Sequence, residues 1–298
     1  MPSTTPRHMT LPTGRPWRST GRGATRCALA LLAALGLMCA PLPPAVAQPR
    51  ADVPIIAAAA NLRGTLEEIL KVYERRTGQR FRISYGSSGN LARQIANKAP
   101  FALFLSADAE RVRWLEQRGR TQGVSAVYAL GRLAIVTGKS SPVAVDARLD
   151  GLKAALASGR VRHLAIANPR HAPYGVAAME ALQRAGLSDA VRDRLALGEN
   201  VAQALQFALS GAADGALVAV SLLSAPSIAG KIRYAVIPAE WHRPLEQRMV
   251  VVKDAGEAVR SLYRFLLGPE ARAILAQRGY AFPLEPRSPA LPAGDKVK

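Results

Sequence analysis

Residues 53–95, VPIIAAAANLRGTLEEILKVYERRTGQRFRISYGSSGNLARQI, decide the fold class. The stretch opens with a short apolar run that is typical of a buried strand, and apolar residues then recur at helical spacing over residues 62–73, with Asn61 where an N-cap is expected. Residues 81–85 alternate like a strand, and the small residues 86–89 predict a tight turn before a second helix. This order of strand, helix, strand and helix predicts a parallel α/β arrangement.

The same alternation continues to residue 277. Further strands are predicted at 103–105, 132–137, 164–167, 215–220 and 247–252. Further helices are predicted at 109–117, 152–158, 174–185, 201–209, 258–267 and 269–277. Because this is more βα units than one small sheet uses, and no repeat or linker divides the chain, we predict two α/β lobes. Each lobe would hold a mixed, mostly parallel sheet flanked by helices.

The first 47 residues have the pattern of an export signal. Five arginines and no acidic residue precede the apolar run 27–40, and Ala45-Val46-Ala47 fits a signal peptidase site. Cleavage after Ala47 would leave 251 of the 298 residues and would remove both cysteines, so the remaining chain could hold no disulfide, cysteine nucleophile or thiolate metal site. The alternative is a retained membrane anchor, although the apolar run is shorter than the roughly 20 residues that a span needs.

The composition describes a basic globular chain. It has 49% hydrophobic residues, and 40 Lys and Arg against 21 Asp and Glu give a net charge of +19. This excess indicates either an anionic partner or a general bias towards arginine, and composition alone leaves both open.

Small neutral polar residues follow several of the predicted strands. They are Asn61, Ser87 with Ser88, Asn168 with Tyr174, and Asn200 before Val201. Ligands of open α/β sheets collect at the carboxyl ends of strands, where helix N-termini present unpaired N–H groups. Hydroxyl and N–H donors suit a fully deprotonated oxyanion, which accepts hydrogen bonds without needing a buried counter-charge. The alternative interpretation is that each is an ordinary N-cap or turn residue.

Seven short motifs occur together in the order that is typical of one family. They are 58–62 (AAANL), 86–95 (GSSGNLARQI), 99–100 (AP), 103–108 (LFLSAD), 168–175 (NPRHAPYG), 199–201 (ENV) and 268–271 (GPEA). With them the chain resembles the periplasmic molybdate-binding proteins of ABC importers, from about residue 53 to residue 283. The resemblance implies the type II periplasmic binding protein fold, in which two crossover strands join two lobes. An oxyanion lies between the lobes and is held by hydrogen bonds alone.

The resemblance also implies the site residues. Ser88 would donate from its hydroxyl and its backbone, Val201 from its backbone N–H, and Tyr174 from its phenol or its N–H. Asn61 stands where many members have serine and pairs with Tyr174 in an Asn version of the site. Ala60 and Ser87 are further candidates. These residues would contact the oxygens of molybdate or tungstate, and none would be a direct ligand of a metal atom.

The resemblance has two departures. Val218 occupies the place of a binding tyrosine, so we do not assign it to the site. Ala102 replaces the usual aspartate, which we expect to alter local hydrogen bonding or lobe docking more than anion contact.

The resemblance also implies how the chain is divided. The first lobe would comprise residues 48–132 and 219–282, the second lobe residues 133–218, and residues 283–298 would form a loose tail. Hinges would lie near 130–133 and 217–220. The expected product is a monomeric, periplasmic solute-binding protein that has no cofactor, binds no nucleic acid and delivers its anion to an ABC permease.

The sequence leaves three alternative functions open. An enzyme acting on anionic esters has little support, because the sequence lacks zinc and nucleophile-elbow motifs, although His171 beside the predicted cleft offers a base. Nucleic-acid binding is suggested only by the arginines near residues 111–120, with no recognition motif. The third possibility keeps the fold but changes the ligand to sulfate, phosphate or a small organic anion. A carboxylate or phosphate specialist would often use a buried arginine, and none is evident at the motif turns.

Overall fold

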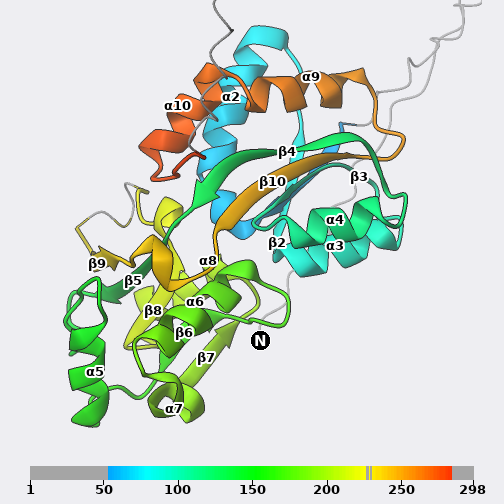
Figure 1. Cartoon of the computed structure of the whole chain (residues 1–298). Helices are drawn as coiled ribbons and strands as arrows, with labels where there is room; N and C mark the ends of the chain where they lie inside the picture. The colour runs from blue at the N-terminus through cyan, green and yellow to red at the C-terminus, as the bar shows by residue number, and fades with distance from the viewer. Residues whose placement is uncertain (1–52, 226–227, 229, 284–298) are drawn as a thin grey trace, which may run out of the picture. The chain divides into compact units, whose positions relative to one another are not determined.

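The computed structural model describes residues 53–225, 228 and 230–283. They belong to the unit Asp52–Lys298, which holds two five-stranded sheets (Figure 1). The predicted signal at 1–47 and nearly all of the predicted tail at 283–298 lie outside the described residues. Within them, no helix combines the length and the apolar character needed to cross a bilayer.

The first sheet has the strand order β2-β1-β3-β10-β4. Its strands are β1 (Ile55–Ala59), β2 (Arg82–Gly86), β3 (Phe101–Ser106), β4 (Thr121–Gly131) and β10 (Leu245–Val252). β1 pairs in parallel with β2 and β3, whereas β10 runs antiparallel to both β3 and β4. This sheet is therefore evenly mixed rather than mostly parallel.

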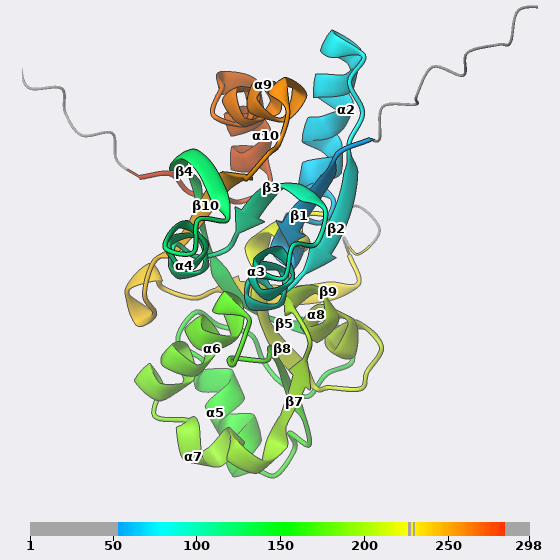
Figure 2. The same ribbon diagram turned by 90° about the vertical axis from the view of Figure 1, so that its right-hand side faces the viewer.

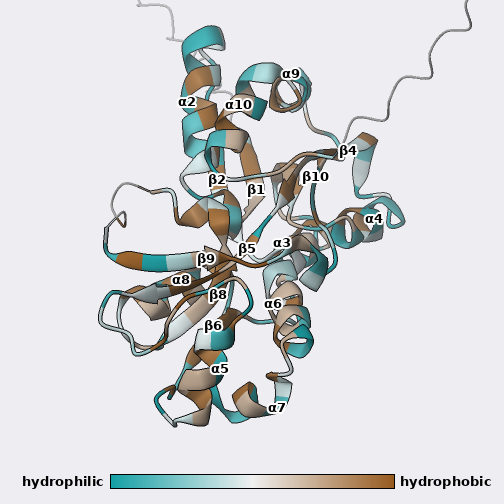
Figure 3. Ribbon diagram, turned by 60° about the vertical axis from the view of Figure 1, so that its left-hand side comes forward, coloured by the Kyte–Doolittle hydropathy of each residue, from teal (hydrophilic) through white to brown (hydrophobic). Residues whose placement is uncertain are grey.

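Two helical layers cover the first sheet, and strand alternation determines which residues face each layer. One face meets α2 (Thr65–Thr77), α9 (Glu257–Leu266) and α10 (Pro269–Gln277), and the other meets α3 (Ser88–Ala96) and α4 (Glu110–Glu116). On β3, Leu103 and Leu105 pack into the first layer while Phe104 between them packs into the second. Figure 3 shows α2 as alternating apolar and polar bands, as expected for a helix with one buried face.

The second sheet has the order β7-β6-β8-β5-β9 and forms one continuous core with its helices. Its strands are β5 (Leu133–Gly138), β6 (Leu164–Ala167), β7 (Leu195–Gly198), β8 (Gly215–Ala219) and β9 (Ile232–Val236). Its helices are α5 (Asp150–Ala157), α6 (Pro173–Arg184), α7 (Ser188–Val191) and α8 (Val201–Leu209). β6 is parallel to β7 and β8, and β5 is antiparallel to β8 and β9, so this sheet is evenly mixed as well.

The chain passes between the sheets in two places that matter for the site. β4 of the first sheet leads through Arg132 directly into β5 of the second. The return runs from β9 through the 3₁₀ turn η4 (Ala239–Trp241) to β10. The predicted return at residue 219 is therefore too early, because β9 still pairs with β5, and the predicted hinge at 217–220 does not coincide with this second crossover.

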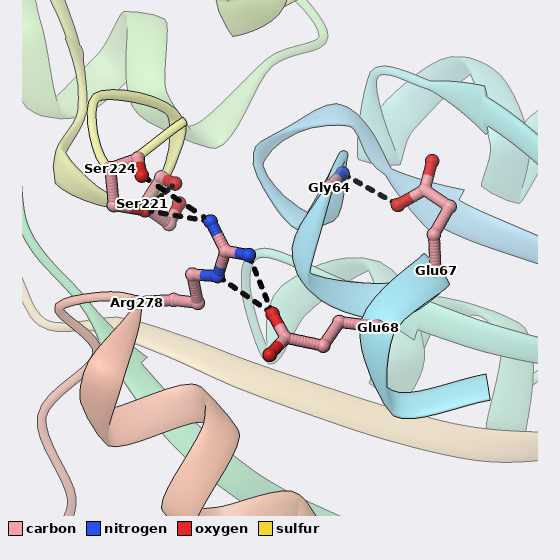
Figure 4. Close-up of polar contacts among 6 residues, drawn as sticks. All are labelled: Gly64, Glu67, Glu68, Ser221, Ser224 and Arg278. Carbon is pink, nitrogen blue, oxygen red and sulfur yellow. Dashed lines mark hydrogen bonds and ion pairs between the residues drawn. The ribbon is translucent and has the colours of Figure 1, made fainter. Parts of the chain in front are cut away.

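The segment after β8 nevertheless touches the first lobe before β9 begins. The Ser221 hydroxyl, in the 3₁₀ turn η3 (Val220–Leu222), donates to the Asn61 carbonyl at 2.8 Å. Arg278 at the end of α10 donates to Glu68 of α2 at 2.6 Å and reaches the Ser224 carbonyl at 3.4 Å (Figure 4). This excursion explains why residues near 219 resemble a crossover in the sequence.

Most predicted elements are present within one or two residues of their expected ends. The helices at 201–209 and 269–277 and the strand at 164–167 have the expected bounds. β4, β7 and β9 were missed, and Asn61 does not cap α2. The cap is Gly64, whose φ of 82° favours glycine and whose N–H donates to the Glu67 carboxylate at 2.5 Å.

Phe104 is a test of the layer between β3 and the helices α3 and α4. Its side chain is fully buried, so Phe104→Ala is expected to lower the free energy of unfolding by about 3–5 kcal/mol through lost burial and a residual cavity. Val124→Ala, at a side chain that is 85% exposed, is the control and should change it by no more than about 0.5 kcal/mol. Urea denaturation measures both, and similar midpoints for the two variants would contradict this packing.

Candidate functional site

Strand ends and helix starts from both sheets surround one small cavity. Here β1 ends in the 3₁₀ turn η1 (Ala60–Leu62), β2 leads into α3, β6 leads to α6 and β7 to α8. The cavity is small and leaves about 10 Å³ for the centre of a water-sized sphere. Its lining residues are Ala59, Ala60, Asn61, Gly86, Ser87, Ser88, Ala107, Ala172, Pro173, Tyr174, Asn200 and Val201. All six predicted site residues are among them, although they come from four separate stretches of sequence.

Three helices begin at this cavity with backbone N–H groups that have no acceptor among the described residues. Ser88 is the first residue of α3, Tyr174 the second of α6 and Val201 the first of α8, positions without an intrahelical acceptor. Within the described part of the chain, these three N–H groups donate no hydrogen bond to a residue outside their helices. Asn200 caps α8 by accepting from the N–H groups of Ala202 and Gln203, which leaves that of Val201 free. The cavity wall is thus a set of aligned donors at positive helix ends.

The two neighbouring serines have different partners. The Ser88 oxygen accepts from the Ala107 N–H at 3.0 Å, so the hydroxyl hydrogen of Ser88 remains available as a donor. The Ser87 oxygen lies 2.9 Å from Nδ1 of His171 and is already engaged. Both side chains are almost fully buried, at 1% and 3% exposure.

Asn61 is held by a buried polar network. Its Nδ2 donates to Oε1 of Gln247 at 2.7 Å and to the Tyr280 hydroxyl at 2.9 Å. The backbone carbonyl of Asn61 accepts from the Tyr280 hydroxyl at 3.0 Å. Gln247 is oriented in turn by donating to the Leu245 carbonyl at 3.0 Å. The Asn61 amide nitrogen is therefore committed to the network, and its buried Oδ1 has no partner among the described residues.

The Tyr174 phenol lies against the first crossover. A Cβ placed on Gly131 would come within 2.3 Å of the Tyr174 hydroxyl, so only glycine fits there. Burial raises the pKa of Tyr174 well above its ordinary value, so the hydroxyl stays protonated. Of the two Tyr174 groups predicted as donors, the N–H is the one at the helix start.

The other residues noted in the sequence lie apart from the cavity wall. Val218 is buried in β8, and Ala102 packs on β3 against the α2 side of the first sheet. No cluster of three histidine, cysteine, aspartate or glutamate side chains suited to a metal ion occurs among the described residues. Sequence reasoning missed Gln247, Tyr280 and Ser221, which reach Asn61 from 160 to 219 positions along the chain.

Comparison with known proteins places this arrangement in a family. Residues 55–281 match the family model described as bacterial extracellular solute-binding protein. The chain belongs to this family of solute-binding proteins. The match spans both sheets and every residue of the cavity wall, so the fold and the cavity belong to the same family unit.

Named relatives agree with the resemblance that the motifs predicted. The chain is 34% identical over 229 residues to the molybdate-binding protein ModA of Azotobacter vinelandii, covering 76% of this chain and 88% of that protein. It is also 34% identical over 241 residues to ModA of Rhodobacter capsulatus, covering 79% and 91%. The solved periplasmic molybdate-binding protein of A. vinelandii superposes with a TM-score of 0.71 at 33% identity, covering 78% of this chain and all of that one. These matches confirm the two-lobed, type II fold of this solute-binding protein.

Gln247 tests whether the network around Asn61 stabilises this solute-binding protein. Gln247→Leu keeps the side-chain size but removes the acceptor of the Asn61 amide, so the free energy of unfolding should fall by about 1–3 kcal/mol. Urea denaturation measures the change. The control is Gln183→Leu on the exposed side of α6, expected within about 0.5 kcal/mol of the parent. A Gln247→Leu protein as stable as this control would refute a stabilising network.

Proposed function

We propose that this protein captures molybdate or tungstate between its two lobes and delivers it to an ABC permease. The observation that carries the proposal is that three helix N–H groups, which have no acceptor among the described residues, and the Ser88 hydroxyl meet at one small cavity. A dianion with four equivalent oxygens can accept from all of these donors at once. The names of the relatives, which are molybdate-binding proteins, point to the same ligand class.

In this proposal each wall residue has a defined part. Ser88 donates from its N–H and its hydroxyl, and Tyr174 and Val201 donate from their backbones. Asn61 and Ala60 shape the wall through η1, whose position Gln247 and Tyr280 fix by holding the Asn61 amide. Capture is a binding event without turnover.

Selectivity among oxyanions depends on which charged, donor and acceptor groups the cavity wall contains. Among the residues that the structure describes, no cationic side chain lines the cavity, so the anion is held by oriented dipoles and not by a counter-ion. Hydrogen phosphate carries a proton that needs an acceptor, and the wall consists mainly of donors. Among the described lining residues, Oδ1 of Asn61 and the Tyr174 hydroxyl have no hydrogen-bond partner and can accept that proton, so phosphate is the critical competitor.

The surrounding biology is part of the same proposal. It includes export with cleavage after Ala47, residence in the periplasm and a monomeric state. The leader pattern in the sequence supports export, and the solved periplasmic relative supports the location. The strongly basic surface stays outside the cavity wall and has no part in anion contact.

Thermal melting with four oxyanions tests the ligand class directly. A ligand that binds only the folded state adds RT ln(1 + [L]/Kd), which is about 2.7 kcal/mol at a hundredfold excess over Kd. We expect molybdate and tungstate to raise the Tm of the purified protein strongly, and sulfate and phosphate to raise it less. Equal shifts for all four, or hydrolysis of p-nitrophenyl phosphate or sulfate by the same sample, would contradict selective binding.

Ser88→Ala tests the hydroxyl donor. Loss of one hydrogen bond to a charged ligand should weaken molybdate binding by about 1–3 kcal/mol, which calorimetric titration would record as a higher Kd. Ser210→Ala, at an exposed hydroxyl that bonds only the Phe207 carbonyl, is the matched control and should leave Kd unchanged. An unchanged Kd in Ser88→Ala would remove this hydroxyl from the site.

A further inference from the structure

Beside the oxyanion cavity, polar side chains of the two lobes meet in a cluster. Ser87 and Asn90 come from the start of α3 in the first lobe. His171 comes from the loop before α6 and Glu199 from the loop before α8, both in the second lobe. We call these four residues the interlobe latch. Figure 2 shows α3 directly above the region where α6 and α8 begin.

His171 occupies the centre of the interlobe latch. Its Nδ1 lies 2.9 Å from the Ser87 hydroxyl and its Nε2 lies 3.5 Å from a carboxylate oxygen of Glu199. The other Glu199 oxygen accepts from the Asn90 amide, and Arg93 donates to the Asn90 carbonyl. One chain of contacts thus crosses between the lobes twice, through His171 to Ser87 and through Glu199 to Asn90.

The backbone brings the same two segments together. The Gly89 N–H donates to the His171 carbonyl at 2.9 Å. A Cβ on Gly89 would lie 2.7 Å from that carbonyl oxygen and 3.0 Å from the His171 Cα, closer than atoms of this kind pack. Glycine at this position is therefore required for the lobes to approach as closely as they do.

The interlobe latch is separate from the groups assigned to the anion. His171, Asn90 and Glu199 do not line the cavity. Ser87 does line it, and its hydroxyl is paired with the imidazole of His171. His171, Asn90 and Glu199 can therefore act on lobe closure without touching the ligand.

The geometry points to His171 and Glu199 as positioning residues that hold the lobes closed and so set the rate at which the bound oxyanion leaves. This inference rests on the proposed function, because it assumes that an oxyanion occupies the cavity. Escape requires the lobes to part, and parting breaks the contacts of His171 with Ser87 and of Glu199 with Asn90. Association, by contrast, starts before these contacts exist, so the latch acts on dissociation.

The test compares release and capture rates of radiolabelled molybdate in the purified protein. Release is followed after a chase with excess unlabelled molybdate. His171→Ala and Glu199→Ala should release the anion about tenfold faster than the parent while the capture rate changes less than about twofold. His171→Asn should restore much of the slow release, because the asparagine amide can take the place of Nδ1 beside Ser87. His163→Ala, at an exposed histidine of the second lobe, is the control and should behave as the parent.

A second measurement follows lobe closure itself, so that the test does not depend on release rates alone. Small-angle scattering of the parent should show compaction on adding molybdate, and Gly89→Ala, which obstructs the approach of the His171 carbonyl, should compact less. Parent-like release in both His171→Ala and Glu199→Ala, with molybdate bound normally, would overturn the latch and leave the proposed function intact. A parent protein that neither binds nor compacts with molybdate or tungstate would overturn both.

Discussion

The structure depends on backbone N–H groups that its helices cannot satisfy internally. An α-helix leaves its first N–H groups without acceptors, and burying such groups is costly unless something accepts from them. Here α3 from the first lobe and α6 and α8 from the second begin at one cavity, and Asn200 satisfies only the N–H groups of Ala202 and Gln203. What remains is a concave surface of donors that neither lobe forms alone. A ligand that only accepts hydrogen bonds provides the missing acceptors for the N–H groups of both lobes. Because it must touch both lobes to do so, binding is coupled to closure.

The wall of the cavity and its rim are built differently. Behind the wall, Asn61, Gln247 and Tyr280 form a fully buried network that joins η1 to β10 and to the segment after α10. Removing any partner there would leave a buried polar group unsatisfied, so this network keeps one arrangement. At the rim, by contrast, Glu199 is 53% exposed, and water can replace its contacts when the lobes part. The buried network therefore keeps the cavity wall fixed, whereas the exposed contacts of Glu199 can break and re-form.

The sequence predicts most of this fold because its signals are local. Helical spacing located α8 and α10 within their true bounds, and the residues noted after the strands include six of the twelve that line the cavity. Features that depend on contacts between residues far apart in the chain were not predicted. β9, with the sequence IRYAV, has three of its five residues partly buried and two exposed, and only its pairing with β5 assigns it to the second lobe. Asn61 has the local pattern of an N-cap, yet tertiary contacts with Gln247 and Tyr280 determine its role.

Polar contacts at the rim are the physical solution for a protein that must both hold and release its ligand. A hydrogen bond between protein groups exchanges with bonds to water, so each adds only about 0.5–1.5 kcal/mol to closure. An apolar seam of the same extent would favour closure at about 25 cal/mol per Å² even when the cavity is empty. Such a protein would close without its anion and exclude it. Because the interlobe latch adds little by itself, the donors of the cavity wall must contribute the rest, and they do so only when an anion is present.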